Sequence, residues 1–487
     1  MRVALVHYHL QGGGVTRIVC HQQKALGRRG ITAVILTGKP PAVPDAGDYR
    51  VVPGLQYEAD RPSVTPGELA AQMRAEAEAA LGGSPDLWHV HNHSLGKNLV
   101  LPLALTLLAA RGERFLYQIH DFAEDGRPAN YRAMLAAMAA GRRQTLSRLL
   151  YPRGDHLHYA VLNRRDYQFL RESGLEADRL HLLYNPVDLG PMASETSVPA
   201  ADREPLWLYP TRAIRRKNLG EFLLWSALAP QGTRFGTTSG PENPVDQPHY
   251  RRWCQVAGEL GLPVRFQLVE PGGPDFGTLL RRAEVAVTTS IAEGFGMTFL
   301  EPWLLGVPVF SRNLPEIMPP AGDEEFCQPW TYDRLDVPLD WLGRTLVEQA
   351  AREGLRRCLA AYERDPAKDE DDVHRVLAAW IRDGKIDFGR LDEPLQETVL
   401  RRLVVGRAQS ALVGPMELTT ATNLHNAIAK NRSLLQNRYS LDRYGETVET
   451  VYRQVAASAV SASDYLDGEI LLDRFLAPER LSLLRVD

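Results

Sequence analysis

The stretch EVAVTTSIAEGFGMTFLEPWLLGVPVFS, residues Glu284–Ser311, decides the fold of this chain. It opens with an apolar run typical of a buried strand, turns at a glycine-containing segment and continues with a helical pattern that ends near Gly306. A second apolar run follows. Strand, helix and strand in this order predict a parallel sheet, because parallel neighbours need a crossover connection of this kind. Open parallel sheets bind ligands at the carboxyl ends of their strands, so the turn marks a candidate binding edge.

Two carboxylates flank this turn. We expect Glu293 in the loop and Glu301 one turn into the following helix. Pro302 removes one backbone hydrogen bond, so the first helical turn is expected to be separate or bent. A helix start offers free N–H groups and a partial positive charge, which suit an anion. The candidate anion-binding residues between the two acids are Gly294, Phe295, Gly296, Met297 and Thr298.

A ligand built as sugar, diphosphate and ribose satisfies both acids and the anion site between them. Glu293 would accept hydrogen bonds from sugar hydroxyls, and Glu301 would accept them from the ribose diol. The counter-charge is expected from YPTRAIRRKNLGEF, Tyr209–Phe222, which places Arg212 and Lys217 in a strand-to-helix loop. Preorganised charge that meets a departing diphosphate is commonly the largest catalytic contribution, with one lost donor costing roughly 3 kcal/mol.

Strand-like and helix-like runs alternate along most of the chain, which predicts an α/β protein with parallel sheets covered on both faces. The stretch Asn185–Pro205 is rich in Pro, Ser and acidic residues and is typical of a linker, and the alternation restarts after it. We therefore expect two Rossmann-like domains that face a central cleft, at residues 1–186 and 187–453. We also expect a helical insertion at about 341–410, and a segment at 454–487 that returns to the first domain.

Composition excludes several classes of protein. With 56 basic and 60 acidic residues the formal charge is −4, so no global basic field favours nucleic acid. The N-terminal stretch lacks the pattern of a signal peptide, and no apolar run reaches the ~20 residues that a membrane span needs. Four cysteines lie far apart without metal-ligand spacing, which is typical of a reducing compartment. We expect a cytoplasmic protein. The basic stretch Gly141–Gly154 could lie on an anionic membrane, although an ordinary surface helix is favoured.

The motifs together resemble one known family, the retaining GT-B glycosyltransferases of family GT4. The resemblance rests on Glu-x7-Glu at Glu293 and Glu301, on Arg-x4-Lys at Arg212 and Lys217, and on QGGG after the first strand. It extends to LPEI after VPVFSRN and to the late stretch NRYSLDRYGETVETVY, and so covers most of the chain.

The resemblance implies a role for each matching residue. The first acid, Glu293, would contact the donor sugar, and Glu301 the nucleotide ribose. Arg212 and Lys217 would bind the diphosphate. His120, in QIHD, matches the family histidine near the C6 hydroxyl of the donor sugar. Two glycines of the first domain would border the diphosphate and the acceptor, namely Gly13 and Gly14.

The implied reaction moves a hexose from a nucleotide-diphosphate sugar to an acceptor hydroxyl by front-face substitution, with retention and without a protein nucleophile. Neither a metal nor another cofactor is expected. The chain departs from the family at PTR, where most relatives have a glycine before the arginine, and in the length of its helical stretch after Trp341. The loop Leu268–Phe276 does not distinguish a UDP, GDP or ADP donor, and the loop His120–Tyr131 suits a polar acceptor.

Other interpretations of the same residues remain open. QGGGVTR could be a simple tight turn, and RAIRRK a nucleic-acid patch. His89, His91 and His93 in WHVHNH lie on one face of a predicted strand and could bind a metal, although no cysteine or acid stands nearby. Rival functions are a nucleotide-sugar epimerase or a sugar phosphorylase on the same fold, or a catalytically silent subunit that binds a nucleotide sugar and regulates a partner.

Overall fold

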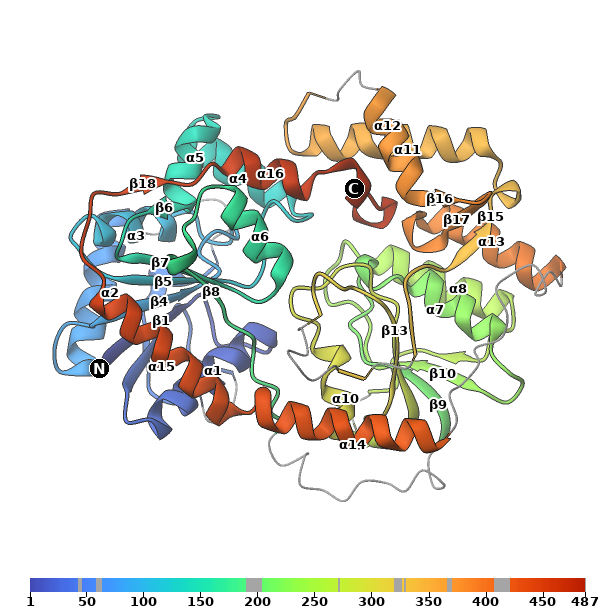
Figure 1. Ribbon diagram of the computed structural model, residues 1–487, viewed down its shortest axis with the longest axis horizontal. Helices are drawn as coiled ribbons and strands as arrows, with labels where there is room; N and C mark the ends of the chain where they lie inside the picture. The colour runs from blue at the N-terminus through green and yellow to red at the C-terminus, as the bar shows by residue number, and fades with distance from the viewer. Residues whose placement is uncertain are drawn as a thin grey trace. The chain divides into compact units, whose positions relative to one another are not determined.

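The computed structural model describes residues 1–42, 46–57, 64–189, 204–269, 272–318, 326–327, 330–365, 370–406 and 421–486. These residues form two compact units, whose elements are labelled in Figure 1. Unit 1 comprises Met1–Pro186 and Asn437–Leu476, and unit 2 comprises Val187–Gln436 and Ala477–Asp487. Among the described residues, no helix has both the length and the apolar character required to cross a bilayer.

Unit 1 is built on a seven-stranded parallel sheet with the strand order β3-β2-β1-β4-β5-β7-β8. Its central strands β4, β5 and β7 are buried at every position, as expected for a sheet covered on both faces. The strands are β1 (Arg2–His7), β2 (Thr32–Thr37), β3 (Tyr49–Val51), β4 (Leu87–His91), β5 (Phe115–Ile119), β7 (Leu157–Val161) and β8 (Leu180–Leu182). The helices between them are α1 (Gly14–Arg28), α2 (Pro66–Leu81), α3 (Leu101–Ala109), α4 (Pro128–Ala139), α5 (Arg143–Leu150) and α6 (Arg164–Glu172).

The late helix α15 (Leu441–Ala457) completes unit 1 and lies along α1 (Figure 1). It begins at Ser440, whose side chain accepts a hydrogen bond from the N–H of Arg443. Its buried residues recur three or four positions apart, which produces one apolar face toward the sheet. These residues are Leu441, Tyr444, Val448, Val451, Tyr452 and Val455, and they share a core with Val19 and Leu26 of α1.

The return of the chain to the first domain therefore differs from the expectation of residues 454–487. It begins at Asn437, because the apolar face of α15 is buried in unit 1. It continues through β18 (Asp464–Tyr465), which pairs antiparallel with β6 (Pro152–Arg153), and through α16 (Gly468–Phe475). It ends at Leu476, and the last residues belong to unit 2, where the backbone oxygen of Leu481 accepts a hydrogen bond from the indole N–H of Trp380.

Unit 2 is built on a six-stranded parallel sheet with the order β11-β10-β9-β12-β13-β14. Strands β9 and β12 are neighbours at its centre, so the loops that follow them meet at one edge. The strands are β9 (Glu204–Tyr209), β10 (Arg234–Thr237), β11 (Val264–Arg265), β12 (Ala283–Thr288), β13 (Val309–Arg312) and β14 (Thr331–Tyr332). The helices are α7 (Leu219–Leu228), α8 (Gln247–Glu259), α9 (Phe276–Arg282) and α10 (Glu301–Leu304).

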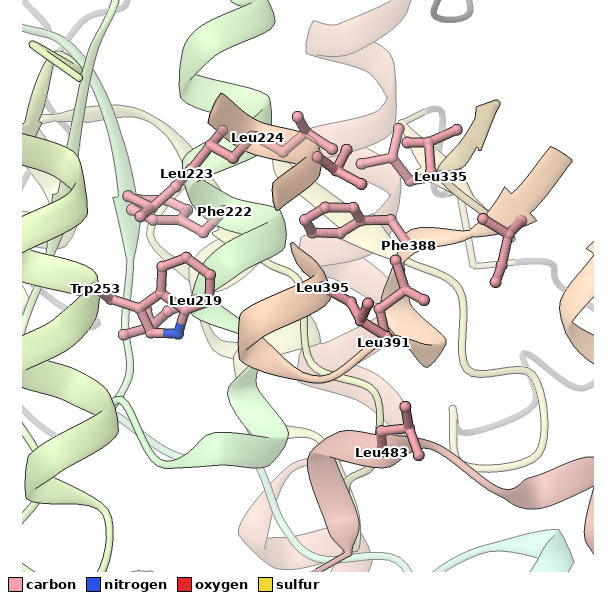
Figure 2. Packing of buried hydrophobic residues seen from close by; sticks show 14 of the residues in the cluster. Leu219, Phe222, Leu223, Leu224, Trp253, Leu335, Phe388, Leu391, Leu395 and Leu483 are labelled. Carbon is pink, nitrogen blue, oxygen red and sulfur yellow. The ribbon is translucent and has the colours of Figure 1, made fainter. Parts of the chain in front are cut away.

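The expected helical insertion contains helices and also a small sheet. Three antiparallel strands, β15 (Asp336–Pro338), β17 (Lys385–Asp387) and β16 (Ile381–Arg382), pair in that order. The helices of this region are α11 (Arg344–Ala361), α12 (Glu370–Trp380), α13 (Glu393–Gly406) and α14 (Ala421–Arg438). Figure 2 shows the apolar core that this region shares with α7, in which Leu219 and Phe222 lie opposite Phe388 and Leu395. The region is therefore part of unit 2.

Candidate functional site

The loop after β12 carries the first candidate acid. Its backbone is fixed to the loop after β9, since the N–H of Ile291 donates to the carbonyl oxygen of Arg216 at 3.0 Å. The hydroxyl of Ser290 also donates to this carbonyl oxygen, at 3.3 Å. The two loops at the centre of the sheet edge are thereby held side by side.

The segment that follows is shorter and more broken than the predicted helix. It forms a 3₁₀ turn, η6 (Met297–Phe299), and then the four-residue helix α10, of which Glu301 is the first residue. Gly296 enters η6 with φ +78°, and a β-carbon there would lie 2.5 Å from Cδ2 of Phe299, so only glycine fits. Pro302 lies in the first turn of α10, where the missing proline N–H costs no hydrogen bond within the helix. The predicted break at Pro302 is present, but Glu301 stands at the helix start rather than one turn in.

Glu293 is buried in an ion cluster with two cations. Its Oε1 pairs with Nζ of Lys217, and its Oε2 lies 3.0 Å from Nη1 of Arg216. Burial alone would raise the pKa of Glu293, yet the charges of Lys217 and Arg216 lower it to about 2. Burial lowers the pKa of Lys217, while Glu293 opposes that change. Burial disfavours a charge on Lys217, whereas the adjacent ionised carboxylate of Glu293 favours it. Because Glu293 is ionised, the two side chains form a charged pair. Glu293 is consequently a fixed acceptor of hydrogen bonds, not a source of protons.

The loop after β9 carries both cations on a short 3₁₀ turn, η5 (Arg215–Lys217). The carbonyl oxygen of Lys217 accepts hydrogen bonds from the hydroxyls of Tyr209 at 2.9 Å and Thr289 at 3.0 Å. Asn218 ends the turn with φ +53° in the left-handed region and begins α7. The backbone that bears Lys217 is therefore held by one side chain of β9 and by one from the residue directly after β12.

Thr211 explains how the loop tolerates PTR in place of the glycine-containing family pattern. Its N–H donates to the hydroxyl of Thr238 at 2.9 Å, and its own hydroxyl accepts from the N–H of Ala213 at 3.0 Å. The left-handed position of this loop lies at Ala213, with φ +51°, and not at Thr211. No backbone conformation at residue 211 demands glycine, and the threonine adds two anchors.

The structure does not bring Arg212 to Glu293. Its side chain is 57% exposed and approaches the exposed Glu242 at 3.9 Å. The cation that joins Lys217 is Arg216, which sequence reasoning missed. The signal was the run RAIRRK, which supplies several cations but does not show which of them points toward the acid loop. That choice follows from η5, which turns Arg216 and Lys217 together toward Glu293.

The remaining donor-side candidates lie in or beside the same loop. Glu301 is buried with a 7% exposed surface, and Phe295 is buried with it. Three others, Gly294, Met297 and Thr298, are half-buried. Because α10 has only four residues, a strong helix dipole is not available here, and any anion contacts would come from loop N–H groups.

Two candidates of unit 1, Gly13 and Gly14, lie at the start of α1. Gly13 is the residue before the helix, and its carbonyl oxygen accepts from the N–H of Arg17 at 3.2 Å. A β-carbon at either glycine would meet no atom within 4 Å among the described residues. Packing inside unit 1 therefore does not explain the glycines, and their role as a ligand border stays a prediction.

His120 follows β5 and is buried. A hydrogen bond of 2.9 Å joins its Nε2 to Nδ1 of His91, and its N–H donates to the side-chain oxygen of Asn92 at 2.7 Å. Burial lowers the pKa of His120 to about 4, so its ring is neutral near pH 7. A neutral ring can donate one hydrogen bond and accept one, which suits a sugar hydroxyl.

The alternative metal set of His89, His91 and His93 is not formed. His89 and His91 stack with ring centres 4.5 Å apart, and Nε2 of His93 hydrogen-bonds to the carbonyl oxygen of Leu150 at 2.7 Å. His89 is bonded instead to Tyr452 of α15 at 2.8 Å. Within the described part of the chain, no group of three or more His, Cys, Asp or Glu side chains could hold a metal ion.

Comparison with known proteins finds similarities for part of this chain. Residues 12–190 match the family model described as Glycosyltransferase Family 4. Mannosylglucosyl-3-phosphoglycerate synthase of Petrotoga mobilis is 26% identical over 234 residues, which are 44% of this chain and 44% of that protein. The chain is thus matched to less than half the length of this curated relative.

Solved structures share the fold at low sequence identity. Sucrose-phosphate synthase of Thermosynechococcus elongatus aligns with a TM-score of 0.53 and 16% identity, covering 93% of this chain and 98% of that one. The Anabaena protein HepE in complex with UDP aligns with a TM-score of 0.54 and 12% identity, covering 92% and 99%. The solved structures and the two Rossmann-like units show that the chain has the GT-B fold, and its residues 12–190 are similar to glycosyltransferase family 4.

Proposed function

We propose that this protein is a retaining glycosyltransferase that moves a hexose from a nucleotide-diphosphate sugar to a hydroxyl of a polar acceptor. The observation that carries the proposal is the cluster that the buried Glu293 forms with the partly buried Lys217 and Arg216 at the carboxyl ends of β9 and β12. Burying an ionised carboxylate beside two cations costs desolvation free energy, and such groups concentrate at functional sites.

The cations supply the charge that a departing diphosphate requires. In the proposed complex, Lys217 contacts the diphosphate as well as Glu293, and the exposed Arg212 moves in as a second contact. Charge that is already in place when the bond breaks costs little reorganisation. Arg216 stays with Glu293 and keeps the acid ionised while Lys217 is engaged.

The acids recognise the neutral, hydroxyl-rich ends of the donor. Glu293 is proposed to accept hydrogen bonds from the hexose, which its low pKa favours. Glu301 is proposed to accept them from the ribose diol at the other end of the loop. Between the two acids, N–H groups of Gly294–Thr298 would contact the diphosphate, since small and half-buried residues allow close approach to the backbone.

The proposed transfer proceeds on one face of the sugar. The bond between the anomeric carbon and the phosphate oxygen breaks, the acceptor oxygen bonds to the same carbon, and the acceptor proton passes to the departing phosphate oxygen. Glu293 is a poor candidate for nucleophile because two cations hold it. Neutral His120 would bind the C6 hydroxyl of the hexose, and Gly13 and Gly14 would leave room for diphosphate and acceptor.

Relatives suggest where a substrate search should begin. One solved structure of HepE contains UDP and glucose, and the name of the curated relative specifies a sugar joined to 3-phosphoglycerate. We therefore place UDP-glucose first among UDP, GDP and ADP donors, and sugar phosphoglycerates first among polar acceptors.

A thermal-shift screen of nucleotide sugars tests the proposal. A true donor present at about 100 times its dissociation constant should stabilise the protein by about 2.7 kcal/mol and raise Tm. The same donor should be hydrolysed slowly by the purified protein, which distinguishes an enzyme from a silent binding subunit. Absence of both effects across UDP, GDP and ADP sugars would reject the proposal.

A further inference from the structure

We propose that α13 is a positioning element for the donor site, in which Glu393 and Gln396 fix Lys217 against Glu293 by holding Arg215 and Asn218, the residues on either side of Arg216 and Lys217. The assignment of Lys217 rests on the proposed function. The contacts of Glu393 and Gln396 that support this positioning role, called the brace below, lie inside unit 2. Glu393 and Gln396 stand three positions apart, so they share one face of the helix.

The first contact is an ion pair between α13 and the start of η5. Nε of Arg215 lies 2.7 Å from Oε1 of Glu393, and Nη2 lies 3.0 Å from Oε2, which makes a two-pronged pair. Both side chains are mostly buried, with 14% and 11% exposed surface. The N–H of Arg215 also donates to Asp246 at 3.1 Å. Paired geometry of this kind fixes orientation as well as distance.

The second contact is an amide pair between α13 and the end of η5. Nε2 of the fully buried Gln396 donates to the side-chain oxygen of Asn218 at 2.9 Å and to the carbonyl oxygen of Phe388 at 3.1 Å. The amide nitrogen of Asn218 donates in turn to Glu221 at 2.8 Å. Asn218 therefore has hydrogen-bond partners on both sides, and these contacts hold its backbone in the left-handed region at φ +53°.

Glu221 is anchored by a buried network that reaches the small sheet. Arg312 donates to Glu221 at 2.9 and 2.6 Å and to Asp387 of β17 at 3.0 and 2.8 Å. The hydroxyl of Tyr332 donates to Glu221 at 2.6 Å. Both carboxylates that contact the guanidinium accept hydrogen bonds from it. A buried charge network is rigid when its members are paired in this way, whereas an unpaired buried charge only costs desolvation free energy. A β-carbon at Gly389 would lie 2.6 Å from Nη2 of Arg312, so the backbone is closely packed over it.

These contacts determine where Lys217 can lie. Arg215 and Asn218 bracket the pair Arg216–Lys217, and both brackets are held by α13. Beneath them, apolar residues of α7 and of the α13 region form a continuous core, with Leu219 and Leu395 visible in Figure 2. The α13 region, whose sequence offers no candidate catalytic residue, thus acts through the loop of η5 that it supports. A misplacement of about 1 Å at a reacting group can cost about 100-fold in rate.

The test combines two variants of the brace with one matched control. Gln396→Met keeps the length of the side chain and removes the hydrogen bond to Asn218, and Glu393→Gln weakens the pair with Arg215. Val399→Ala is the control, because Val399 is fully buried on the same helix and belongs to the apolar core. It should lower stability through lost packing without touching η5.

The first measurement does not depend on activity. Amide hydrogen exchange in the peptide Thr211–Leu219 should accelerate about tenfold in Gln396→Met and in Glu393→Gln, and should stay unchanged in Val399→Ala. Equal exchange of this peptide in all four proteins would overturn the brace. Because no substrate is needed, a failed donor screen would leave this result intact and would count only against the proposed function.

The second measurement uses the donor that the screen identifies. Gln396→Met should lower kcat about tenfold or more and should also raise KM for the donor, because a displaced Lys217 contacts the diphosphate less well both in the bound donor and as the bond breaks. In a Lys217→Met background, Gln396→Met should cause no further loss, because the residue acts through Lys217. An additional tenfold loss in that background, or a kcat loss equal to that of Val399→Ala, would assign Gln396 a general structural role.

Discussion

Glu293 is the single residue on which the proposed chemistry depends most. Replacing it with Gln keeps its size and removes the charge that Lys217 and Arg216 contact. We expect kcat to fall by about 10²–10³-fold, as for other losses of preorganised charge. Arg282→Gln is a suitable control, because Arg282 lies half exposed beside Glu204 at the opposite ends of β12 and β9. Initial rates of nucleoside diphosphate release measure both variants, and a Glu293→Gln rate near that of Arg282→Gln would contradict the assigned role.

Glu124, in the loop after His120, is expected to make the stability of unit 1 depend on pH. Burial raises its pKa to about 7, while the hydroxyl of Tyr151 lies 3.0 Å from each of its carboxyl oxygens. An acid whose pKa is higher in the folded chain stabilises the fold fully below about pH 4.5, and this contribution is lost as the pH rises through 7.

The matching prediction compares the wild type with Glu124→Gln, which cannot ionise. The free energy of unfolding of the wild type, relative to the variant, should fall by up to about 3 kcal/mol between pH 4.5 and pH 8. Urea unfolding followed at several pH values measures this difference, and pH effects of other residues cancel in it. A difference that does not change with pH would show that folding leaves the pKa of Glu124 at its usual value.

At the level of elements, the contact between α7, β13 and β17 leaves no space beside the buried guanidinium of Arg312. Gly389→Ala places a β-carbon 2.6 Å from Nη2 of Arg312 and 3.0 Å from Oε2 of Glu221. We expect a loss of about 1–3 kcal/mol in the free energy of unfolding, as for other overpacked sites. Gly258→Ala on α8 is the control, because a β-carbon there meets nothing within 4 Å.

That control should leave stability unchanged or raise it by up to about 1 kcal/mol, because alanine favours a helix more than glycine does. Chemical denaturation followed by circular dichroism compares the two variants. Equal stability of Gly389→Ala and the wild type would mean that the network around Arg312 can shift, and the argument for a rigid support of Asn218 would lose its basis.

Elements also show where sequence patterns were sufficient. The alternation of strands and helices predicted both parallel sheets, since each buried strand is a short apolar run between turn residues. The motif Glu-x7-Glu correctly predicted that Glu293 lies in a loop, because Gly294 and Gly296 interrupt regular secondary structure there. The strands β15, β16 and β17 were missed, as each has only two or three residues and carries no periodic signal. The helix expected after Gly296 was too long, because the chain forms the 3₁₀ turn η6 and then the separate four-residue helix α10, with Pro302 in its first turn.

Interactions between distant parts of the chain were beyond the sequence. Arg216 meets Glu293 across 77 positions, and Gln396 meets Asn218 across 178, so no local pattern could reveal either contact. The assignment of α15 to unit 1 depends in the same way on its apolar face matching that of α1. Residue types could be predicted, whereas the choice among neighbouring candidates required the fold.

For the whole molecule, the proposed function assigns the nucleotide-sugar donor to unit 2 and the acceptor to unit 1. The cluster of Glu293, Lys217 and Arg216 belongs entirely to unit 2, together with the helix that supports it. Donor affinity should therefore respond to changes in unit 2, and His120 of unit 1, which is proposed to contact the hexose, should influence turnover.

Calorimetric titration with the donor found in the screen tests this account most directly. Lys217→Met removes the cation proposed to bind the diphosphate and should weaken Kd at least about tenfold, since a lost charged contact costs roughly 1.5–3 kcal/mol. Arg282→Gln removes a charge elsewhere in unit 2 and should bind the donor as the wild type does. Equal affinity of the wild type and Lys217→Met would contradict the proposal that Lys217 binds the diphosphate.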